Sequence, residues 1–93
     1  MIRLIKADGH IVDLTNAKKG PPQGPELDRL VKSKANLVEN PRLRQARTQL
    51  IVGERNGPFN RTASNELQRH YGCAVGVYGD VLILSGQHRI PRN

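Results

Sequence analysis

The chain has 93 residues, no Trp and one Cys, which predicts a single domain over residues 1–93 with a modest, mainly aliphatic core. One Cys excludes an internal disulfide, and no segment has the roughly 18 apolar residues that a membrane span requires. Fifteen Lys and Arg against eight Asp and Glu give a formal charge of +7, which favours an anionic partner.

The N-terminal segment predicts a β-hairpin. In MIRLIKADGHIVDLT, Asp8-Gly9 favours a type I′ turn between a strand near Ile2 and a return over residues 11–14. Arg3 and Lys6 interrupt the apolar run, so the segment does not have the pattern of a signal peptide. Together with the lone cysteine, this predicts a cytoplasmic protein.

A loop, a helix and a strand are expected next. Residues 16–25 (NAKKGPPQGP) are rich in Gly, Pro and Lys and predict a flexible loop. PELDRLVKSK, residues 25–34, predicts a short helix with Pro25 at its first position. Residues 35–39 are compatible with a strand, and Asn40-Pro41 with a turn.

The second half of the chain repeats the order of strand, helix and strand. A buried strand is expected at residues 50–52, followed by a turn at 56–58 and a helix that ends at Tyr71 before Gly72. Asn60, Thr62 and Ser64 are the candidate caps of that helix. We expect two strand pieces within residues 73–84, of which the second is central to the sheet. A basic tail over residues 87–93 ends the sequence.

This order, ββαββαββ, predicts an α+β fold. We expect a mixed or antiparallel sheet of short strands with two short helices.

No group of residues predicts catalysis or metal binding. The three histidines lie far apart without Cys, Asp or Glu at ligand spacing, which argues against a metal site. His10 and His88 are expected on the surface, and His70 partly buried in packing. Cys73 follows the end of a helix and is expected to be a small buried hydrophobe rather than a nucleophile. The sequence therefore predicts a protein that is not an enzyme and that needs no cofactor.

Two arginine clusters are the candidate binding features. Arg42 and Arg44 would share one face of an extended segment, with Arg47 close by and Arg55 in the next turn. On the helix after Asn60, a polar arc contains Arg61, Asn65, Gln68 and Arg69. These side chains make bidentate contacts to phosphates and bases, and they are also ordinary on a solvated helix face.

The stretch from Leu50 to Gly86 resembles a family of small uncharacterised proteins of phages and mobile elements. The likeness lies in LIVGERNG, PFN, RTASNELQRHYG and YGDVLILSG, and IRLIKADGHIVDLT and PELDRLV resemble that family's opening strands and first helix. The resemblance implies a small, non-enzymatic accessory protein, which would lie in the host cytoplasm if a phage encodes it. In its size, fold class and content of Arg, Asn and aromatic residues, the chain also resembles phage counter-defence proteins that sequester signalling nucleotides.

Three functions follow as hypotheses. In the first, a homo-oligomer binds a phosphate-bearing nucleotide at its subunit boundary, as a counter-defence protein that sequesters a host immune signal would. Its expected ligand contacts are Phe59, Asn60, Arg61, Asn65, Arg69, Tyr78 and Arg89. In the second, an accessory protein binds nucleic acid through Arg42, Arg44, Arg47 and Arg55. In the third, the protein inhibits a host defence or nucleic-acid-handling factor.

Overall fold

The computed structural model describes residues 1–54 and 57–91. Within these residues, one antiparallel sheet contains five strands in the order β2-β1-β5-β4-β3, with three helices around it. The strands are β1 (Ile2–Ile5), β2 (Ile11–Asp13), β3 (Ala35–Val38), β4 (Thr48–Gly53) and β5 (Val81–Ser85). The helices are α1 (Gly24–Val31), α2 (Pro41–Gln45) and α3 (Arg61–Tyr71), and a 3₁₀ turn, η1, covers Gly86–His88. The expected α+β class is confirmed.

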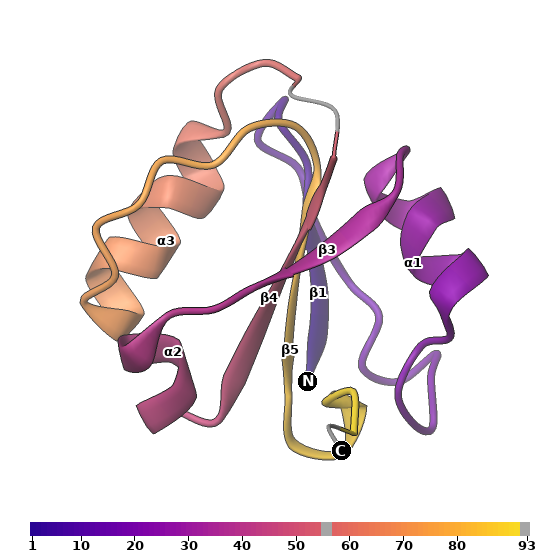
Figure 1. The fold of residues 1–93 in the computed structure, drawn as a ribbon. Coiled ribbons are helices and arrows are strands. Elements are labelled where there is room, and N and C mark those ends of the chain that lie inside the picture. The colour runs from indigo at the N-terminus through magenta and orange to yellow at the C-terminus, as the bar shows by residue number, and fades with distance from the viewer. Residues whose placement is uncertain (55–56, 92–93) are drawn as a thin grey trace.

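The sheet lies between two helical layers. Figure 1 shows α1 on one face of the sheet and α2 and α3 on the other. The central strand β5 is buried on both faces, because Val81 and Ile83 pack toward α3 while Leu82 and Leu84 pack toward α1. A strand covered on both faces reads as a continuous apolar run, which is the pattern of VLIL in the sequence.

The hairpin turn differs from the expected type I′. Asp8 does not have the positive φ that a type I′ turn requires, whereas Gly9 has φ of 99°. The Gly9 N–H donates to the Lys6 carbonyl at 2.9 Å, and the Lys6 N–H donates to the His10 carbonyl at 2.8 Å. The connection is therefore a three-residue loop with a left-handed glycine, which is the next most common hairpin solution.

The helix boundaries also correct the expectations. Helix α1 ends at Val31 rather than at residue 34, because Lys32 adopts a left-handed conformation with φ of 61°. Asn40-Pro41 does not form a turn within an extended segment but begins α2, a helix that the sequence did not predict. The Asn40 side chain accepts hydrogen bonds from the N–H groups of Arg42 and Leu43, and Pro41 occupies the first helical position.

Helix α3 ends where the sequence predicts. Gly72 follows Tyr71 with φ of 64°, and its N–H donates to the Gln68 carbonyl, as in a left-handed helix cap. Residues 73–78 do not form the expected strand of the sheet. The segment runs back along α3 and makes one isolated bridge, between Tyr78 and Phe59. We call residues 73–80 the return segment.

Two of the four expectations for the histidine and cysteine side chains are confirmed and two are wrong. His88 is fully buried in η1 rather than on the surface, and the His70 side chain is exposed rather than packed. His10 is exposed and Cys73 is buried, as expected. No helix in the described part of the chain has the length and apolar character to cross a bilayer.

The burial of β5 predicts its sensitivity to truncation. Leu82→Ala should lower the free energy of unfolding by about 2–5 kcal/mol, because Leu82 is fully buried in the central strand. Val12→Ala on the edge strand β2, where Val12 is 38% exposed, is the control and should cost much less. Urea denaturation measures both, and equal costs would contradict the central position of β5.

Candidate functional site

An aromatic pair lies at the end of the molecule where α3 begins. Phe59 and Tyr78 contact each other edge to face, with their ring centroids 5.5 Å apart, and each is 49% exposed. They are the two most exposed large apolar residues among the described residues. Half-exposed rings of this kind leave a face available for stacking against a planar ligand.

Asn60 supports the aromatic pair from beneath and does not face solvent. Its side chain is fully buried: Nδ2 donates to the carbonyls of Ile5 and Gly79 at 2.9 and 2.8 Å, and Oδ1 accepts from the N–H of Ala63 at 2.9 Å. The expected role of Asn60 as a ligand contact is therefore corrected: it caps α3 and ties that helix to β1 and to the return segment. Its candidacy as a helix cap is confirmed.

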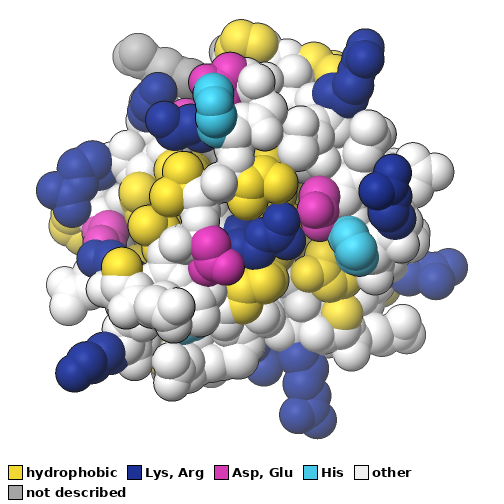
Figure 2. All heavy atoms as spheres, turned by 180° about the vertical axis from the view of Figure 1, so that it is seen from behind, with side chains coloured by type: hydrophobic (Ala, Val, Ile, Leu, Met, Phe, Trp, Pro, Cys, Tyr) yellow, Lys and Arg dark blue, Asp and Glu magenta, His cyan; other side chains and the backbone are white. Residues whose placement is uncertain are grey.

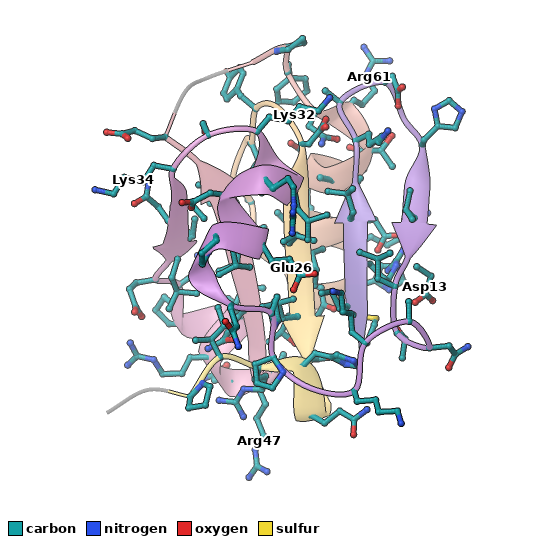
Figure 3. The ribbon with its side chains drawn as sticks, turned by 90° about the vertical axis from the view of Figure 1, so that its right-hand side faces the viewer. Asp13, Glu26, Lys32, Lys34, Arg47 and Arg61 are labelled. Atoms are coloured by element: carbon teal, nitrogen blue, oxygen red, sulfur yellow. The ribbon has the colours of Figure 1, made fainter. Side chains whose placement is uncertain are left out.

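Three exposed arginines converge at the opposite end. Arg44 on α2, Arg47 after α2 and Arg89 after η1 line one shallow hollow beside the last residues of β3. We call these three residues the arginine end. Figure 3 shows Arg47 extending away from the body at the end opposite Arg61. The hollow measures about 30 Å³, so it offers a surface for a phosphate group rather than an enclosed pocket.

Arg47 occupies an unusual backbone position. Its φ is 53°, in the left-handed region where a non-glycine residue is uncommon and where glycine would be favoured. The neighbouring Ala46 N–H donates to the Arg42 carbonyl and the Arg47 N–H donates to the Arg44 carbonyl, so this turn closes α2 and directs the chain into β4. The turn does not require an arginine at this position, so the backbone conformation does not explain why Arg47 is an arginine.

Arg89 is held by its neighbours in the chain. His88 on one side is fully buried, and Ile90 on the other makes a reciprocal pair of bonds with buried Gln49 of β4. The Ile90 N–H donates to Gln49 Oε1 at 2.6 Å, and Gln49 Nε2 donates to the Ile90 carbonyl at 3.0 Å. These anchors fix the backbone that presents Arg89.

A valine-lined hollow shares one residue with the arginine end and one with the aromatic pair. It measures about 170 Å³ and lies between the β3–β4 edge of the sheet and the return segment. Its lining residues are Val38, Val52, Gly53, Val75, Gly76, Val77 and Tyr78. Val38 also lines the hollow of the arginine end, and Tyr78 belongs to the aromatic pair. We call the arginine end, this hollow and the aromatic pair together the strip.

The other expected contacts lie away from the strip or beside it. Arg61, Asn65 and Arg69 are exposed along α3. Arg42 lies beside the end of α3, where its guanidinium would be 3.6 Å from a Cβ placed at Gly72. Arg55 lies outside the described residues. The seven expected nucleotide contacts thus do not meet at one place in the chain: the aromatic pair and Arg89 lie at opposite ends of the strip.

The charges show why the arginine end is available for a ligand. Arg3 is paired with Glu66 at 3.3 Å, and Arg44 with Glu39 at 3.0 Å in a solvent-exposed pair of small energetic value. Within residues 1–54 and 57–91, neither Arg47 nor Arg89 makes an ion pair. Figure 2 shows the back of the molecule, where basic side chains are dispersed with acidic and apolar ones among them.

Cys73 and the possible metal ligands are the remaining reactive groups. Burial raises the pKa of the Cys73 thiol, which keeps it in the weakly nucleophilic protonated form. In the described part of the chain, no three His, Cys, Asp or Glu residues come together at a distance suited to a metal ion.

Comparisons with known proteins add no relative: no family model, curated protein or solved structure matches the chain. The likeness to a family of phage proteins, the homo-oligomer with its subunit-boundary pocket and the inhibitor of a host factor all stay predictions.

The bonds of Asn60 predict the effect of replacing it. Asn60→Ser keeps an oxygen near the Ala63 N–H but leaves the carbonyls of Ile5 and Gly79 without their donor, so it should cost about 1–3 kcal/mol. Asn60→Asp should cost more, because a buried carboxylate would face both carbonyls. Asn65→Ser on the exposed face of α3 is the matched control and should change stability by less than about 0.5 kcal/mol.

Thermal unfolding at neutral pH compares the three variants. Unchanged stability of both Asn60 variants would contradict the structural role given to this amide.

Proposed function

We propose that this protein is a non-enzymatic binder of single-stranded nucleic acid and that the strand lies along the strip. The observation that supports this is the sharing of lining residues: Val38 lines both the hollow of the arginine end and the valine-lined hollow, and Tyr78 lines the second hollow and belongs to the aromatic pair. Cationic side chains that follow the backbone, together with aromatic rings that accept bases, are the two elements of sequence-tolerant single-strand binding.

The arginine end suits the phosphates. Arginine presents a planar fork that pairs with two phosphate oxygens, and Arg47 and Arg89 are exposed without an acidic partner among the described residues. Glu39 lies against Arg44, so Arg44 exchanges one anionic partner for another when a phosphate binds. A few contacts of this kind give moderate affinity with strong dependence on salt.

The aromatic pair suits unpaired bases. Tyr78 forms part of the wall of the valine-lined hollow and contacts Phe59 edge to face, so the pair offers a ring face next to an apolar floor. In a duplex the faces of the bases are stacked on their neighbours and are inaccessible to such rings, whereas an unpaired base can stack on them. The aromatic pair therefore favours single strands over a duplex.

The size of the hollows favours a strand over one small nucleotide. Pockets that enclose a small ligand usually measure roughly 300–1,000 Å³. The two hollows of the strip measure about 30 and 170 Å³, and the buried amide of Asn60 is committed to three internal bonds. A nucleotide chain that lies across the surface uses both ends of the strip without needing an enclosed pocket.

The arginine end makes the first functional prediction. Arg47→Gly and Arg89→Gln should each weaken binding of fluorescein-labelled dT12, and each should reduce the slope of log K against log salt by about 0.7. Arg47→Gly should leave the melting temperature unchanged or raise it, because glycine favours the left-handed backbone at φ of 53°. Fluorescence anisotropy between 50 and 200 mM salt measures the binding.

Arg29→Gln is the charge-matched control, because Arg29 is exposed on α1 across the sheet from α2 and α3. If Arg29→Gln weakens binding as much as the other two variants, net charge alone explains the affinity and the strip is not the site.

Replacement of Tyr78 tests the second functional prediction. Tyr78→Ala should weaken dT12 binding by about 1–3 kcal/mol, the value of one base stacked on an aromatic ring. Tyr78→Phe keeps the ring and should bind nearly as well as the unmodified protein. Equal losses in the two variants would contradict stacking, and AMP that competes as well as dT12 would favour a mononucleotide as the ligand.

A further inference from the structure

Asp80 has one carboxylate oxygen that receives no hydrogen bond. Its Oδ1 accepts from the Ala7 N–H at 2.9 Å, which fixes the side chain beside the end of β1. Its Oδ2 is buried and has no hydrogen-bond partner among the described residues. The Lys32 ammonium lies 3.4 Å from Oδ2, so the two charges attract each other without a directed N–H bond. A buried acceptor without a donor is costly, and a ligand N–H that reached Oδ2 would remove this cost.

Lys32 occupies a backbone position that favours glycine. It ends α1 with φ of 61°, in the left-handed region where helices usually place Gly or Asn. Its side chain is 74% exposed, so burial does not explain a lysine there. Residues held in such sparsely populated conformations cluster at binding sites. Figure 3 shows Lys32 at the same end of the molecule as Arg61, where α3 begins.

Two hollows adjoin this ion pair. They measure about 230 and 450 Å³, and the larger one is within the range of pockets that hold small ligands. Both are lined by Ala7, Lys32, Pro58 and Asp80. The larger hollow is also lined by Lys6 and by Asp8, which pairs with His10 at 3.0 Å. The ion pair therefore borders a space that is large enough for one base of a nucleic-acid strand.

The hollows lie next to the aromatic pair. Pro58 and Gly79 line the smaller hollow, and they are the chain neighbours of Phe59 and Tyr78. The Gly79 N–H donates to the Pro58 carbonyl at 2.8 Å, which holds the two segments together. A strand that stacks one base on Tyr78 thus brings a neighbouring base to these hollows.

Guanine is the base that complements an ammonium beside a carboxylate. Lys32 offers a donor, and Asp80 offers two acceptor oxygens, of which Oδ1 keeps a lone pair beyond its bond to Ala7. The Watson–Crick edge of guanine presents the O6 acceptor and then the N1–H and N2–H donors, which is the matching order. Thymine places its N3–H between two carbonyl oxygens that repel a carboxylate, and adenine and cytosine each have an acceptor nitrogen beside the amino group. Unpaired bases are read on this edge.

We propose that Asp80 and Lys32 form a guanine-binding site, in which Asp80 accepts from N1–H and the 2-amino group and Lys32 donates to O6. Oδ2 is covered in the free protein, so the exposed Lys32 side chain moves from Oδ2 toward O6 as the base enters. Lys6 at the larger hollow suits the adjoining phosphate. This inference rests on the proposed function and gives it a base preference: the strip holds the strand, and the ion pair selects guanine at one position.

The first test changes the base and leaves the protein unmodified. Fluorescence anisotropy compares dT12 with labelled 12-mers that carry one other base in the middle of the thymines. Guanine should tighten binding about five- to a hundredfold, the discrimination of a bidentate contact, whereas adenine and cytosine should add nothing. Hypoxanthine lacks the 2-amino group and should lose part of the gain, whereas 7-deazaguanine keeps the Watson–Crick edge and should retain it. Equal affinities for all of these strands would overturn the proposal.

The second test changes the ion pair. Asp80→Asn keeps an oxygen for the Ala7 N–H and replaces Oδ2 by an NH₂ group, so the guanine gain should disappear while the affinity for dT12 stays the same or rises with the added net positive charge. Lys32→Gly suits φ of 61° and should reduce the gain without loss of stability. Lys34→Gln, at an exposed lysine, is the charge-matched control for Lys32 and should affect both strands equally. A guanine gain that survives in Asp80→Asn would overturn the proposal, and the base series decides the point if this variant does not fold.

The two strands also separate this inference from the proposed function. If dT12 binds and guanine adds nothing, the strip stands and the guanine site fails. If only the strand with guanine binds, the guanine site stands and the strip fails. If neither strand binds, both fail.

Discussion

The buried amide of Asn60 is the interaction on which the arrangement of the site depends. One side chain caps α3, bonds the end of β1 and bonds the Gly79 carbonyl in the return segment. The backbone of Asn60 continues the attachment, since its N–H donates to the Val77 carbonyl at 2.9 Å. Ser64 adds a third tie, because its hydroxyl oxygen accepts from the Val77 N–H at 3.1 Å. Phe59 and Tyr78 sit on either side of these bonds and owe their contact to them.

This dependence explains how a chain with so few aromatic residues presents two of them on its surface. Burial of Phe59 and Tyr78 would be favourable for a small core, yet the core is filled by aliphatic residues from both faces of β5. The rigid bonds beneath the aromatic pair fix its place, so the exposed rings do not collapse onto the sheet. A surface that is ordered before the ligand arrives reduces the entropy that binding must remove.

Most of the fold is predictable because each segment carries a local sequence pattern of its own. Examples are the apolar run of β5, the glycine that ends α3 and the alternation in β1. The errors arose where the same residues suit two local structures. Asn40-Pro41 begins a helix as readily as it forms a turn, and here the burial of Leu43 in the core favours the helix that Asn40 caps. Residues 73–78 have strand-forming valines, but this segment runs back along α3 and its Tyr78 makes an isolated bridge with Phe59 rather than joining the sheet.

The candidate site was less predictable because it depends on contacts between distant segments. Asn60 precedes a helix with the signal of a cap, and no local pattern shows that its amide also reaches Ile5, which is 55 residues away. His88 lies in a polar tail, and its burial depends on a loop 70 residues earlier. The sequence identified two sets of candidate contacts, namely the arginines near residue 44 and the two aromatic residues Phe59 and Tyr78. That Arg44, Arg47 and Arg89 share one hollow could be learned only from the structure.

An NMR titration tests whether nucleic acid binds along the strip. ¹⁵N–¹H spectra of the labelled protein should be followed as unlabelled dT12 is added. If the strand lies along the strip, the amide shifts should concentrate on residues 44–49, on residues 73–78 of the return segment and on Arg89. Shifts confined to the exposed face of α3, or shifts spread evenly over amides near every lysine and arginine, would contradict it.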